Sequence, residues 1–445
     1  MPQFQSKRPP LKERRFTSQA VEATIQEVSA AIRDPELAWL FANCLPNTLD
    51  TTVTFEHDCD GKPDTFVITG DIDAMWLRDS TNQVWPYLSF LGDDAELKTL
   101  IAGVIHRQAD CVRLDSYANA FFQDGSQESE WKNDKTEMRP GVHERKYELD
   151  SLCAFFRLSC GYWAATNDAA CFDADWQSAV AVALDTIELE QAGLEESLSS
   201  PYTFQRISTW GAELYPNRPF RRCGLSKSPF RPSDDLTLFP FLVPANAMAV
   251  VCLRQLAEML TQLNLCLSLA NKAASLAETI DHGLRHHATV NHPTHGEILA
   301  YEIDGFGGQY LMDDANVPSL LSLPYLGYCA KDTPLYQRTR DFVLSRDNPY
   351  YAKGAAGRGI GGPHVGPGWI WPMSITMQAL TSGSDEEIAD CLRLLKTTHA
   401  GTGFIHETFW KDDPAQYTRP WFAWANTLFG ELIVTLHRER PHLLG

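Results

Sequence analysis

The chain has 445 residues, of which 44% are hydrophobic and 21% are charged, a composition typical of a globular protein with a large buried core. Its 57 acidic side chains outnumber its 38 basic ones and give a formal net charge of -19. Such a surface repels phosphate backbones and anionic lipids, so we expect neither nucleic acid nor a membrane as a partner.

The N-terminal stretch and the cysteines indicate a compartment. Residues 1–17 are polar and basic and lack the apolar centre of a signal peptide, and we expect them to form a flexible segment. No apolar run approaches the roughly 20 residues needed to cross a bilayer. The eleven cysteines form no Cys-x-x-Cys pair and no Cys/His cluster with zinc spacing, and their odd number favours a reducing compartment. We therefore expect a cytoplasmic protein.

Helical periodicity dominates the chain, and apolar residues recur at the spacing of one buried helix face. In chain order, the predicted helices cover residues 18–32, 35–44, 80–91, 94–112, 149–163, 176–189, 247–269, 273–284, 317–326, 371–380, 386–395 and 421–436. Two β-prone pieces, 52–55 and 65–69, are expected to form a small hairpin.

The long connections between these helices are rich in glycine, proline and aromatic residues and carry most of the unusual polar clusters. Long loops in a compact domain usually serve function. A dozen helices with functional loops on one side favour an all-α fold, an (α/α)6 barrel with an inner and an outer ring of six helices. We expect residues 1–445 to form a single catalytic domain of this kind.

The first polar cluster lies between Gly70 and Ser80 and includes Asp73, Trp76, Arg78 and Asp79. Carboxylates and guanidinium groups bind vicinal hydroxyls through charge-assisted hydrogen bonds, and a tryptophan face covers the apolar face of a pyranose. The cluster therefore has the chemistry of a pocket for a neutral sugar. Taken alone, it is also compatible with an internal Arg–Asp pair that fixes a loop.

The second cluster is Ser233-Asp234-Asp235. Ser233 is a natural helix N-cap, and the two aspartates would then occupy the first helical turn. Adjacent carboxylates rarely share a face, so one of them could instead point into a cleft. The segment alone supports both interpretations equally.

The third cluster surrounds Glu407, which follows His406 among several phenylalanines and tryptophans. A His-Glu-x-x-His zinc motif would need a second histidine where Trp410 stands, so we expect no metal here. Burial among aromatic rings would tune the pKa of this carboxyl.

Other loops add hydrogen bonders and aromatic rings. The glycine-rich loops lack the lysine of a P-loop, so phosphate is not the expected ligand. Glu148 and Asp150 are expected to face different ways, one of them as a structural residue at a helix start. The further candidates for contact with a ligand are Asn119, Asp313, Asp314, Asn316, His364 and Trp369.

With these segments in order, the chain resembles glycoside hydrolase family 125, the exo-acting α-1,6-mannosidases, over most of residues 50–430. The matching segments are Gly70–Ser80, Tyr117–Phe121, Tyr147–Ser151, Phe230–Asp235, Gly305–Tyr325, Gly359–Pro372 and His406–Trp424. The resemblance implies an (α/α)6 barrel and removal of a terminal mannose from an α-mannoside oligosaccharide with inversion. It also implies that neither a metal nor another cofactor is required.

The resemblance also implies roles for individual residues. The family's general acid matches an aspartate in the Asp234-Asp235 segment, and its general base matches Glu407. We assign the acid to Asp234, with Asp235 as the competitor, and by the same resemblance Arg78 and Asp79 hold the terminal sugar. Inverting glycosidases need one protonated carboxyl and one carboxylate, roughly 6.5–9.5 Å apart so that a water fits between them.

Three other functions are compatible with parts of the pattern. A terpene cyclase would need Asp-Asp-x-x-Asp, and Asp313-Asp314-Ala315-Asn316-Val317 misses it. A non-catalytic carbohydrate-binding module would use the aromatic rings but has no need for an acid and a base in separate loops. Another barrel glycosidase, or a phosphorylase acting on a different sugar, is the remaining alternative, and phosphate dependence would identify the phosphorylase.

Overall fold

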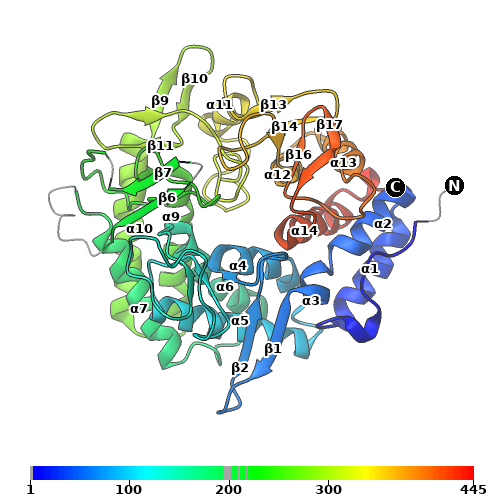
Figure 1. The fold of residues 1–445 in the computed structure, drawn as a ribbon, viewed down its shortest axis with the longest axis horizontal. Helices are drawn as coiled ribbons and strands as arrows, with labels where there is room; N and C mark the ends of the chain where they lie inside the picture. The colour runs from blue at the N-terminus through cyan, green and yellow to red at the C-terminus, as the bar shows by residue number, and fades with distance from the viewer. Residues whose placement is uncertain (1–3, 194–201, 209–210, 217) are drawn as a thin grey trace. The chain divides into compact units, whose positions relative to one another are not determined.

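The computed structural model describes residues 4–193, 202–208, 211–216 and 218–445, and helices dominate it (Figure 1). The described residues contain thirteen α-helices: α1 (Gln19–Ala31), α2 (Pro35–Cys44), α3 (Asn47–Thr51), α4 (Leu77–Val84), α5 (Ala95–Leu114), α6 (Leu149–Thr166), α7 (Ala174–Leu189), α9 (Val243–Gln262), α10 (Leu267–His287), α11 (Pro334–Val343), α12 (Pro372–Leu380), α13 (Asp385–Thr397) and α14 (Ala423–Glu439). Among these residues, no helix combines the length and the apolar character needed to cross a bilayer.

Short strands fill the connections and form sheets of two or three strands. They are β1 (Val53–His57), β2 (Pro63–Val67), β3 (Met75–Trp76), β4 (Ala120–Phe121), β5 (Val142–Glu144), β6 (Phe204–Ser208), β7 (Gly211–Tyr215), β8 (Phe241–Leu242), β9 (Thr289–His292), β10 (Gly296–Leu299), β11 (Glu302–Ile303), β12 (Gln309–Tyr310), β13 (Tyr351–Lys353), β14 (Arg358–Ile360), β15 (Trp369–Ile370), β16 (Thr408–Trp410) and β17 (Asp413–Thr418). The predicted hairpin is confirmed, because β1 pairs antiparallel with β2 and Val53 lies opposite Val67.

Side-chain caps explain where several helices begin. The Ser18 hydroxyl accepts a hydrogen bond from the backbone N–H of Val21 at the start of α1, and Asp34 and Ser384 cap α2 and α13 in the same way. Each cap satisfies backbone N–H groups that the first helical turn leaves without partners. These starts agree with the predicted helices at 18–32, 35–44 and 386–395.

Three predicted helices differ from the structure. The stretch 80–91 divides into the end of α4 and a 3₁₀ helix, Trp85–Phe90. The stretch 247–269 is broken between α9 and α10, where Asn264 and Cys266 adopt positive φ angles of 52° and 26°. Residues 317–326 form turns instead of a helix, since Pro318 and Pro324 interrupt the backbone ladder. The carboxylate of Asp313 instead accepts the N–H groups of residues 320 and 321.

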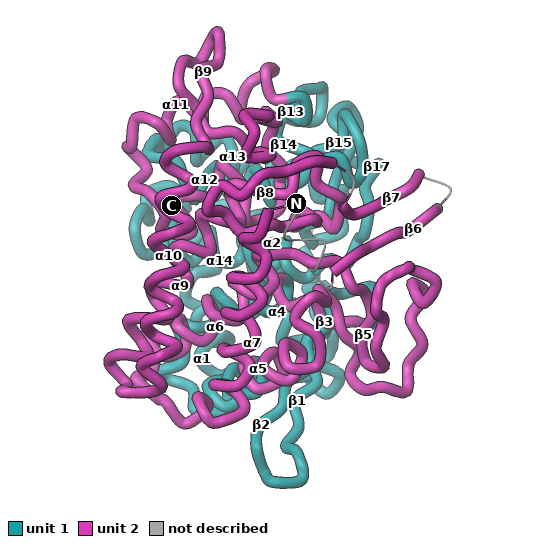
Figure 2. Tube along the Cα trace, turned by 90° about the vertical axis from the view of Figure 1, so that its left-hand side faces the viewer, with its two compact units in different colours: residues 1–73, 79–104, 349–445 teal, residues 74–78, 105–348 magenta. Residues whose placement is uncertain are grey.

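The chain divides into two compact units, drawn in different colours in Figure 2. Unit 1 comprises residues 1–73, 79–104 and 349–445, and unit 2 comprises residues 74–78 and 105–348. In unit 1, α14 packs against α2, α3 and α12, and α12 also packs against α13. In unit 2, α9 packs against α6 and α10, and α10 also packs against α7. That all 445 residues act as a single catalytic domain stays a prediction.

Part of the N-terminal segment has defined contacts within unit 1. Arg8 Nε donates a hydrogen bond to Asp50 Oδ2 at 2.7 Å, and the same guanidinium pairs with Glu22. The predicted flexibility of residues 1–17 is not tested by these contacts, but they attach Arg8 to α1 and α3.

Candidate functional site

Arg78 gathers three carboxylates in unit 2. It stands in the first turn of α4, directly after β3, and only 2% of its surface is exposed. Its Nη1 donates to Glu148 Oε2 at 2.5 Å and to Asp150 Oδ2 at 3.3 Å, and its Nη2 lies 3.5 Å from Asp234 Oδ1. One guanidinium therefore faces three acidic groups, so their charges are only partly balanced.

Glu148 and Asp150 do not face different ways, and that prediction is wrong. Glu148 is the extended residue before α6, with φ −127° and ψ 120°, whereas Asp150 lies in the first turn of the helix. The change of backbone conformation between them lets both side chains reach Arg78.

Asn119, the residue directly before β4, connects the same carboxylates. Its Nδ2 donates to Asp234 Oδ1 at 3.1 Å, to Glu144 Oε2 at 3.2 Å and to Glu148 Oε1 at 3.3 Å. Its Oδ1 accepts the backbone N–H of Lys146, which fixes the orientation of the amide. The side chain is fully buried. An amide has two N–H bonds, so three acceptors must share them and lie close together.

These carboxyls hold protons more tightly than free ones do. Burial raises the pKa of Glu148 well above its usual range, and the charges of Asp234 and Asp150 add to that, while Arg78 opposes it. Burial likewise raises the pKa of Asp150 to about 6, against the lowering effect of Arg78. Loss of protons from this cluster is therefore disfavoured relative to free carboxyls.

The Asp234 segment is a tight turn, and the alternative in which Ser233 caps a helix is wrong. Asp234 N donates to Arg231 O at 2.9 Å, Arg231 N donates to Asp235 O at 2.8 Å, and Asp234 adopts φ +64°. The Ser233 hydroxyl hydrogen-bonds the carboxylate of Asp235 and that of Asp314, both at 3.0 Å, instead of accepting from a helix N–H.

The turn gives the two adjacent aspartates different surroundings. Asp234 contacts Arg78 and Asn119, and 26% of its side chain is exposed. Lys146 Nζ donates to the backbone oxygen of Asp234 at 2.6 Å, which holds the turn in place. Asp235 instead accepts from Ser233. Asp234 is thus the aspartate that joins the carboxylate cluster.

The 313–316 segment borders this turn from the other side. Asp314 accepts from Ser233 and, at 3.0 Å each, from the backbone and side-chain N–H groups of Asn316. Asp313 accepts from Leu320 N and Leu321 N at 2.8 and 3.0 Å and is fully buried. Burial raises the pKa of Asp313 to about 8. These contacts support the loop from inside.

Trp76 and Asp73 have contrasting positions. Trp76 lies in β3, is buried and packs its ring 5.1 Å from that of His143. Asp73 is exposed and belongs to unit 1.

A second polar cluster surrounds Glu407 in unit 1. Glu407 precedes β16 and is buried, with 3% of its surface exposed. Its Oε2 accepts from the Thr418 hydroxyl at 2.8 Å, and its Oε1 accepts from Arg419 Nη1 at 3.3 Å. Pairing of Thr408 with Thr418 between β16 and β17 brings these partners to the carboxylate.

Arg419 links Glu407 to the Gly70–Ser80 segment. Its Nη2 and Nε donate to Asp71 Oδ1 at 2.6 and 2.9 Å. Burial lowers the pKa of Arg419, but the hydrogen bond to Asp71 and the charges of Glu407, Asp71 and Asp79 raise it overall. The guanidinium therefore stays charged, and the carboxylates of Asp79 and Glu407 both lie within its influence.

The predicted aromatic partners lie near the same strands. Trp369 in β15 pairs with Trp410 in β16, and their ring centroids are 5.6 Å apart. His364 is exposed, 6.2 Å from the ring of Trp371. The ring of His406 stacks on Tyr417 at 3.8 Å, and burial lowers its pKa to about 4, so it is neutral at physiological pH.

The residues predicted for the site are divided between the two units. Unit 2 brings together Arg78, Asn119, Asp234, Asp235, Asp314 and Asn316, and unit 1 holds Asp79, Glu407, His364 and Trp369. The separation of Asp234 and Glu407 stays a prediction. The sequence pattern did not single out Lys146, Ser233, Thr418 or Arg419 for these contacts. The partners of Lys146 and Ser233 lie 88 and 81 residues away in the chain. Thr418 and Arg419 lie 11 and 12 residues from Glu407, and the pairing of β16 with β17 brings them to it.

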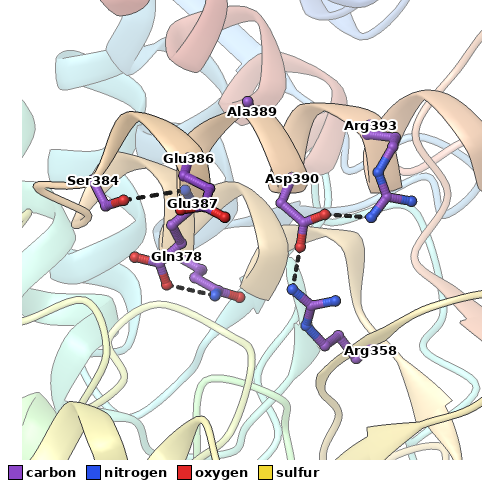
Figure 3. A pocket seen from close by; sticks show the side chains of 8 residues that line it. All are labelled: Arg358, Gln378, Ser384, Glu386, Glu387, Ala389, Asp390 and Arg393. Atoms are coloured by element: carbon purple, nitrogen blue, oxygen red, sulfur yellow. Dashed lines mark hydrogen bonds and ion pairs between the residues drawn. The ribbon is translucent and has the colours of Figure 1, made fainter.

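A separate surface depression in unit 1, about 590 Å³ in volume, is lined by charged residues of α13 and its neighbours (Figure 3). Asp390 pairs with both Arg358 and Arg393, and Gln378 donates to Glu387 at 2.7 Å. Several lining side chains thus pair with one another, and none of the predicted site residues lines this depression.

Comparisons with known proteins agree with this chemistry. A family model described as metal-independent α-mannosidase (GH125) matches residues 34–434. The meiotically up-regulated gene 157 protein of Schizosaccharomyces pombe is 44% identical over 455 residues, which cover 98% of this chain and 89% of the relative.

Solved structures extend the likeness to the fold. A metal-independent α-mannosidase of Streptococcus pneumoniae, in a non-productive substrate complex with α-1,6-mannobiose, is 38% identical with a TM-score of 0.89, covering 96% of this chain and 100% of that one. A bacterial glucoamylase complexed with acarbose is 12% identical with a TM-score of 0.55, covering 91% of this chain and 57% of that one, and shares the fold alone. The predicted all-α (α/α)6 fold class is confirmed by these likenesses and by the helical content of the described residues.

Proposed function

The chain belongs to glycoside hydrolase family 125, the metal-independent α-mannosidases, and from this premise we propose that it is an exo-acting α-1,6-mannosidase that inverts the anomeric configuration. The observation that carries the proposal is the contrast between two carboxyl environments. Asp234 shares the donors Arg78 and Asn119 with Glu148, whose pKa is raised by burial. Glu407 instead accepts hydrogen bonds from a charged guanidinium and a hydroxyl. The α-1,6-mannobiose bound by the S. pneumoniae relative supports the substrate class.

Asp234 is the proposed general acid. Its side chain is partly exposed, so it can approach a glycosidic oxygen, and its neighbours Glu148 and Asp150 disfavour loss of the last proton from the cluster. As the bond from C1 to the leaving oxygen breaks, the Asp234 proton moves to that oxygen. The leaving sugar departs as a neutral alcohol.

Glu407 is the proposed general base. Hydrogen bonds from Thr418 and Arg419 fix the direction of its carboxylate. A water attacks C1 from the face opposite the leaving group and transfers a proton to Glu407. The products are β-mannose and the shortened oligosaccharide, and exchange with solvent returns the proton from Glu407 to Asp234.

The sugar-binding residues follow from the same arrangement. We propose that Asp79, Asp73, Trp369 and His364 contact the terminal mannose or its neighbour. The side of the site that holds Asp234 is lined or supported by Arg78, Asn119, Asp235, Asp314 and Asn316. Trp76 and Asp313 are buried supports of the same loops. Because Arg78 is buried against Glu148, we propose that it acts on the sugar mainly by positioning the neighbouring carboxylates.

Time-resolved proton NMR with α-1,6-mannobiose tests the proposal. β-Mannose as the first product would support inversion by the Asp234–Glu407 pair. α-Mannose first would indicate retention and overturn the acid–water–base assignment. Absence of cleavage would overturn the α-1,6 specificity, and a panel of α-1,2-, α-1,3- and α-1,4-linked mannobioses would then identify the linkage.

We also propose a cytoplasmic location. All eleven cysteines are free thiols, and Cys59 and Cys266 are exposed, which suits a reducing compartment. Short mannosides would then be the substrates. Recovery of the protein in the secreted fraction of its native cells would overturn this location.

A further inference from the structure

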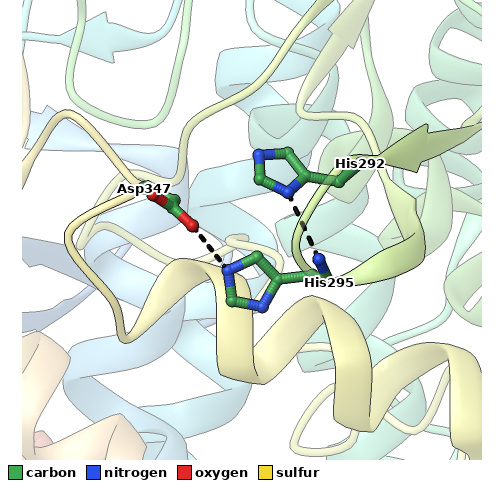
Figure 4. A group of neighbouring side chains, drawn as sticks. All are labelled: His292, His295 and Asp347. Atoms are coloured by element: carbon green, nitrogen blue, oxygen red, sulfur yellow. Dashed lines mark hydrogen bonds and ion pairs between the residues drawn. The ribbon is translucent and has the colours of Figure 1, made fainter.

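Two imidazoles and a carboxylate meet at the β9–β10 turn of unit 2 (Figure 4). Nitrogen atoms of His292 and His295 and a carboxylate oxygen of Asp347 all lie within 4.8 Å of one another. His295 Nε2 is 2.9 Å from Asp347 Oδ2. These residues belong to none of the segments proposed above for catalysis or sugar binding.

The turn itself sets the spacing of the two histidines. His292 is the last residue of β9 and pairs with Gly296, the first residue of β10, so His292 and His295 flank a tight turn. Gly296 adopts φ +71°, a conformation that glycine favours and that closes the turn. Both rings then stand on the same side, with centroids 5.0 Å apart.

Helix α11 supports both rings and positions the third group. The ring of Phe342 lies 5.4 Å from that of His292 and 5.8 Å from that of His295. Arg338 Nε also donates to Glu297 O at 2.7 Å, which fastens the hairpin to the helix. Asp347 follows α11, and its backbone N–H donates to Ser345 Oγ at 3.1 Å. These contacts therefore hold the two imidazoles and the carboxylate in place.

Two histidines and one aspartate are a donor set that suits Zn²⁺, with a water completing a tetrahedron. Tetrahedral bonds of about 2.0–2.2 Å to zinc would set the ligand atoms about 3.3–3.6 Å apart. His295 Nε2 and Asp347 Oδ2, now 2.9 Å apart, would therefore separate slightly, and since all three atoms lie within 4.8 Å of one another, only small side-chain movements are needed. The site is open to solvent, because the Asp347 side chain is 43% exposed and that of His295 is 14% exposed. An ion and its water can therefore enter.

One existing contact would change on binding. His292 Nδ1 accepts long hydrogen bonds from the backbone N–H groups of Thr294 and His295, at 3.2 and 3.4 Å. A metal bond through Nε2 requires the proton to move to Nδ1, with loss of these two weak bonds. This cost is small against two metal–nitrogen bonds.

We propose that His292, His295 and Asp347 bind one Zn²⁺ ion and thereby fasten the β9–β10 turn to the loop after α11. The ion has a structural role and takes no part in sugar hydrolysis. The simpler alternative is an ion pair between His295 and Asp347 in which His292 takes no part. The zinc site requires His292, whereas the ion pair does not.

Calorimetric titration of tag-free, EDTA-treated protein with ZnCl2 tests the proposal. We expect one equivalent to bind, with affinity reduced at least about tenfold in His292→Ala, His295→Ala and Asp347→Asn, because each removes a ligand. The matched control is His282→Ala/His286→Ala, which removes another exposed, stacked histidine pair, 4.0 Å apart on α10, and should leave the affinity unchanged.

Titration with Co²⁺ gives a spectroscopic readout that does not depend on enzyme activity. We expect visible absorption bands of a four-coordinate ion in the wild type and their loss in Asp347→Asn, a substitution that preserves the shape of an exposed side chain. Absence of a one-equivalent site would overturn the proposal. So would full affinity in His292→Ala, or loss of binding in the α10 control alone.

Discussion

Asn119 donates a hydrogen bond from Nδ2 to Oδ1 of Asp234 over 3.1 Å, while the same nitrogen also faces Glu148 at 3.3 Å. A single amide thus holds the proposed acid beside the carboxyl of Glu148. Burial raises the pKa of Glu148 well above its usual range. This relationship distinguishes Asp234 from Asp235, which accepts from Ser233.

Replacement of Asp234 should remove acid catalysis without removing the base. We expect Asp234→Asn to lower kcat on α-1,6-mannobiose by about 10²–10⁴-fold, the usual contribution of a general acid. A 2,4-dinitrophenyl α-mannoside, whose leaving group needs little protonation, should lose much less. Asp235→Asn is the matched comparison and should affect both substrates alike, because Asp235 is not the proposed proton donor. Equal losses on both substrates in Asp234→Asn would rule out the acid assignment.

Glu148 should set the upper pH limit of activity. In a pair of neighbouring carboxyls, the charge of one raises the pKa for loss of the last proton from the other. The neutral side chain in Glu148→Gln removes that repulsion, so the alkaline limb of the kcat/KM profile should move to lower pH. Profiles measured between pH 4 and 9 would show the shift. An unmoved limb, or one moved upward, would contradict a shared proton.

Arg419 should matter through Glu407. Arg419→Ala removes a charged donor from the proposed base, and a hydrogen bond to a charged group is worth about 1.5–3 kcal/mol, so kcat should fall by about 10–100-fold. Arg393→Ala is the control, because Arg393 is an exposed arginine of the same unit that pairs with Asp390 on the surface. Steady-state kinetics would show the difference. A rise in KM alone would indicate that Arg419 contacts the sugar and does not orient the base.

Metal removal should separate the proposed zinc site from catalysis. EDTA should leave kcat/KM on mannobiose unchanged, since the proposed acid and base are side chains of the protein. The same treatment should lower the melting temperature if an ion had occupied the site of His292, because ligand bound only to the folded state stabilises it. Loss of activity on chelation, restored by Zn²⁺, would contradict a purely structural ion.

Sequence patterns predicted local structure better than contacts over long distances. Helix periodicity and caps such as Ser18 and Asp34 act within a few residues, so α1 and α2 were predicted closely. The turn at Asp234 was not predicted, because the Ser233 hydroxyl bonds the carboxylate of Asp314, 81 residues away. In the same way, nothing near Glu407 indicates that Arg419 would also bind Asp71, 348 residues earlier. At the Asp234 turn, a tertiary hydrogen bond from Ser233 to Asp314 thus replaced the predicted local cap.

The buried carboxyl of Asp313 should leave a signature in the pH dependence of stability. Burial raises the pKa of Asp313 in the folded state to about 8, well above the ordinary value of an aspartate. A carboxyl with a raised pKa binds its proton more tightly in the folded state. Its contribution to the free energy of unfolding is therefore complete below about pH 4 and is lost as the pH rises toward 8.

Asp313→Asn should flatten this dependence, since an amide does not titrate and can still accept from Leu320 N. The measurement is the urea midpoint of both proteins at pH 5, 6, 7 and 8. We expect the midpoint of the wild type to fall relative to the variant as the pH rises. Asp385→Asn, at an exposed position, controls for general charge effects. Parallel curves for the wild type and Asp313→Asn would show that Asp313 ionises normally despite its burial.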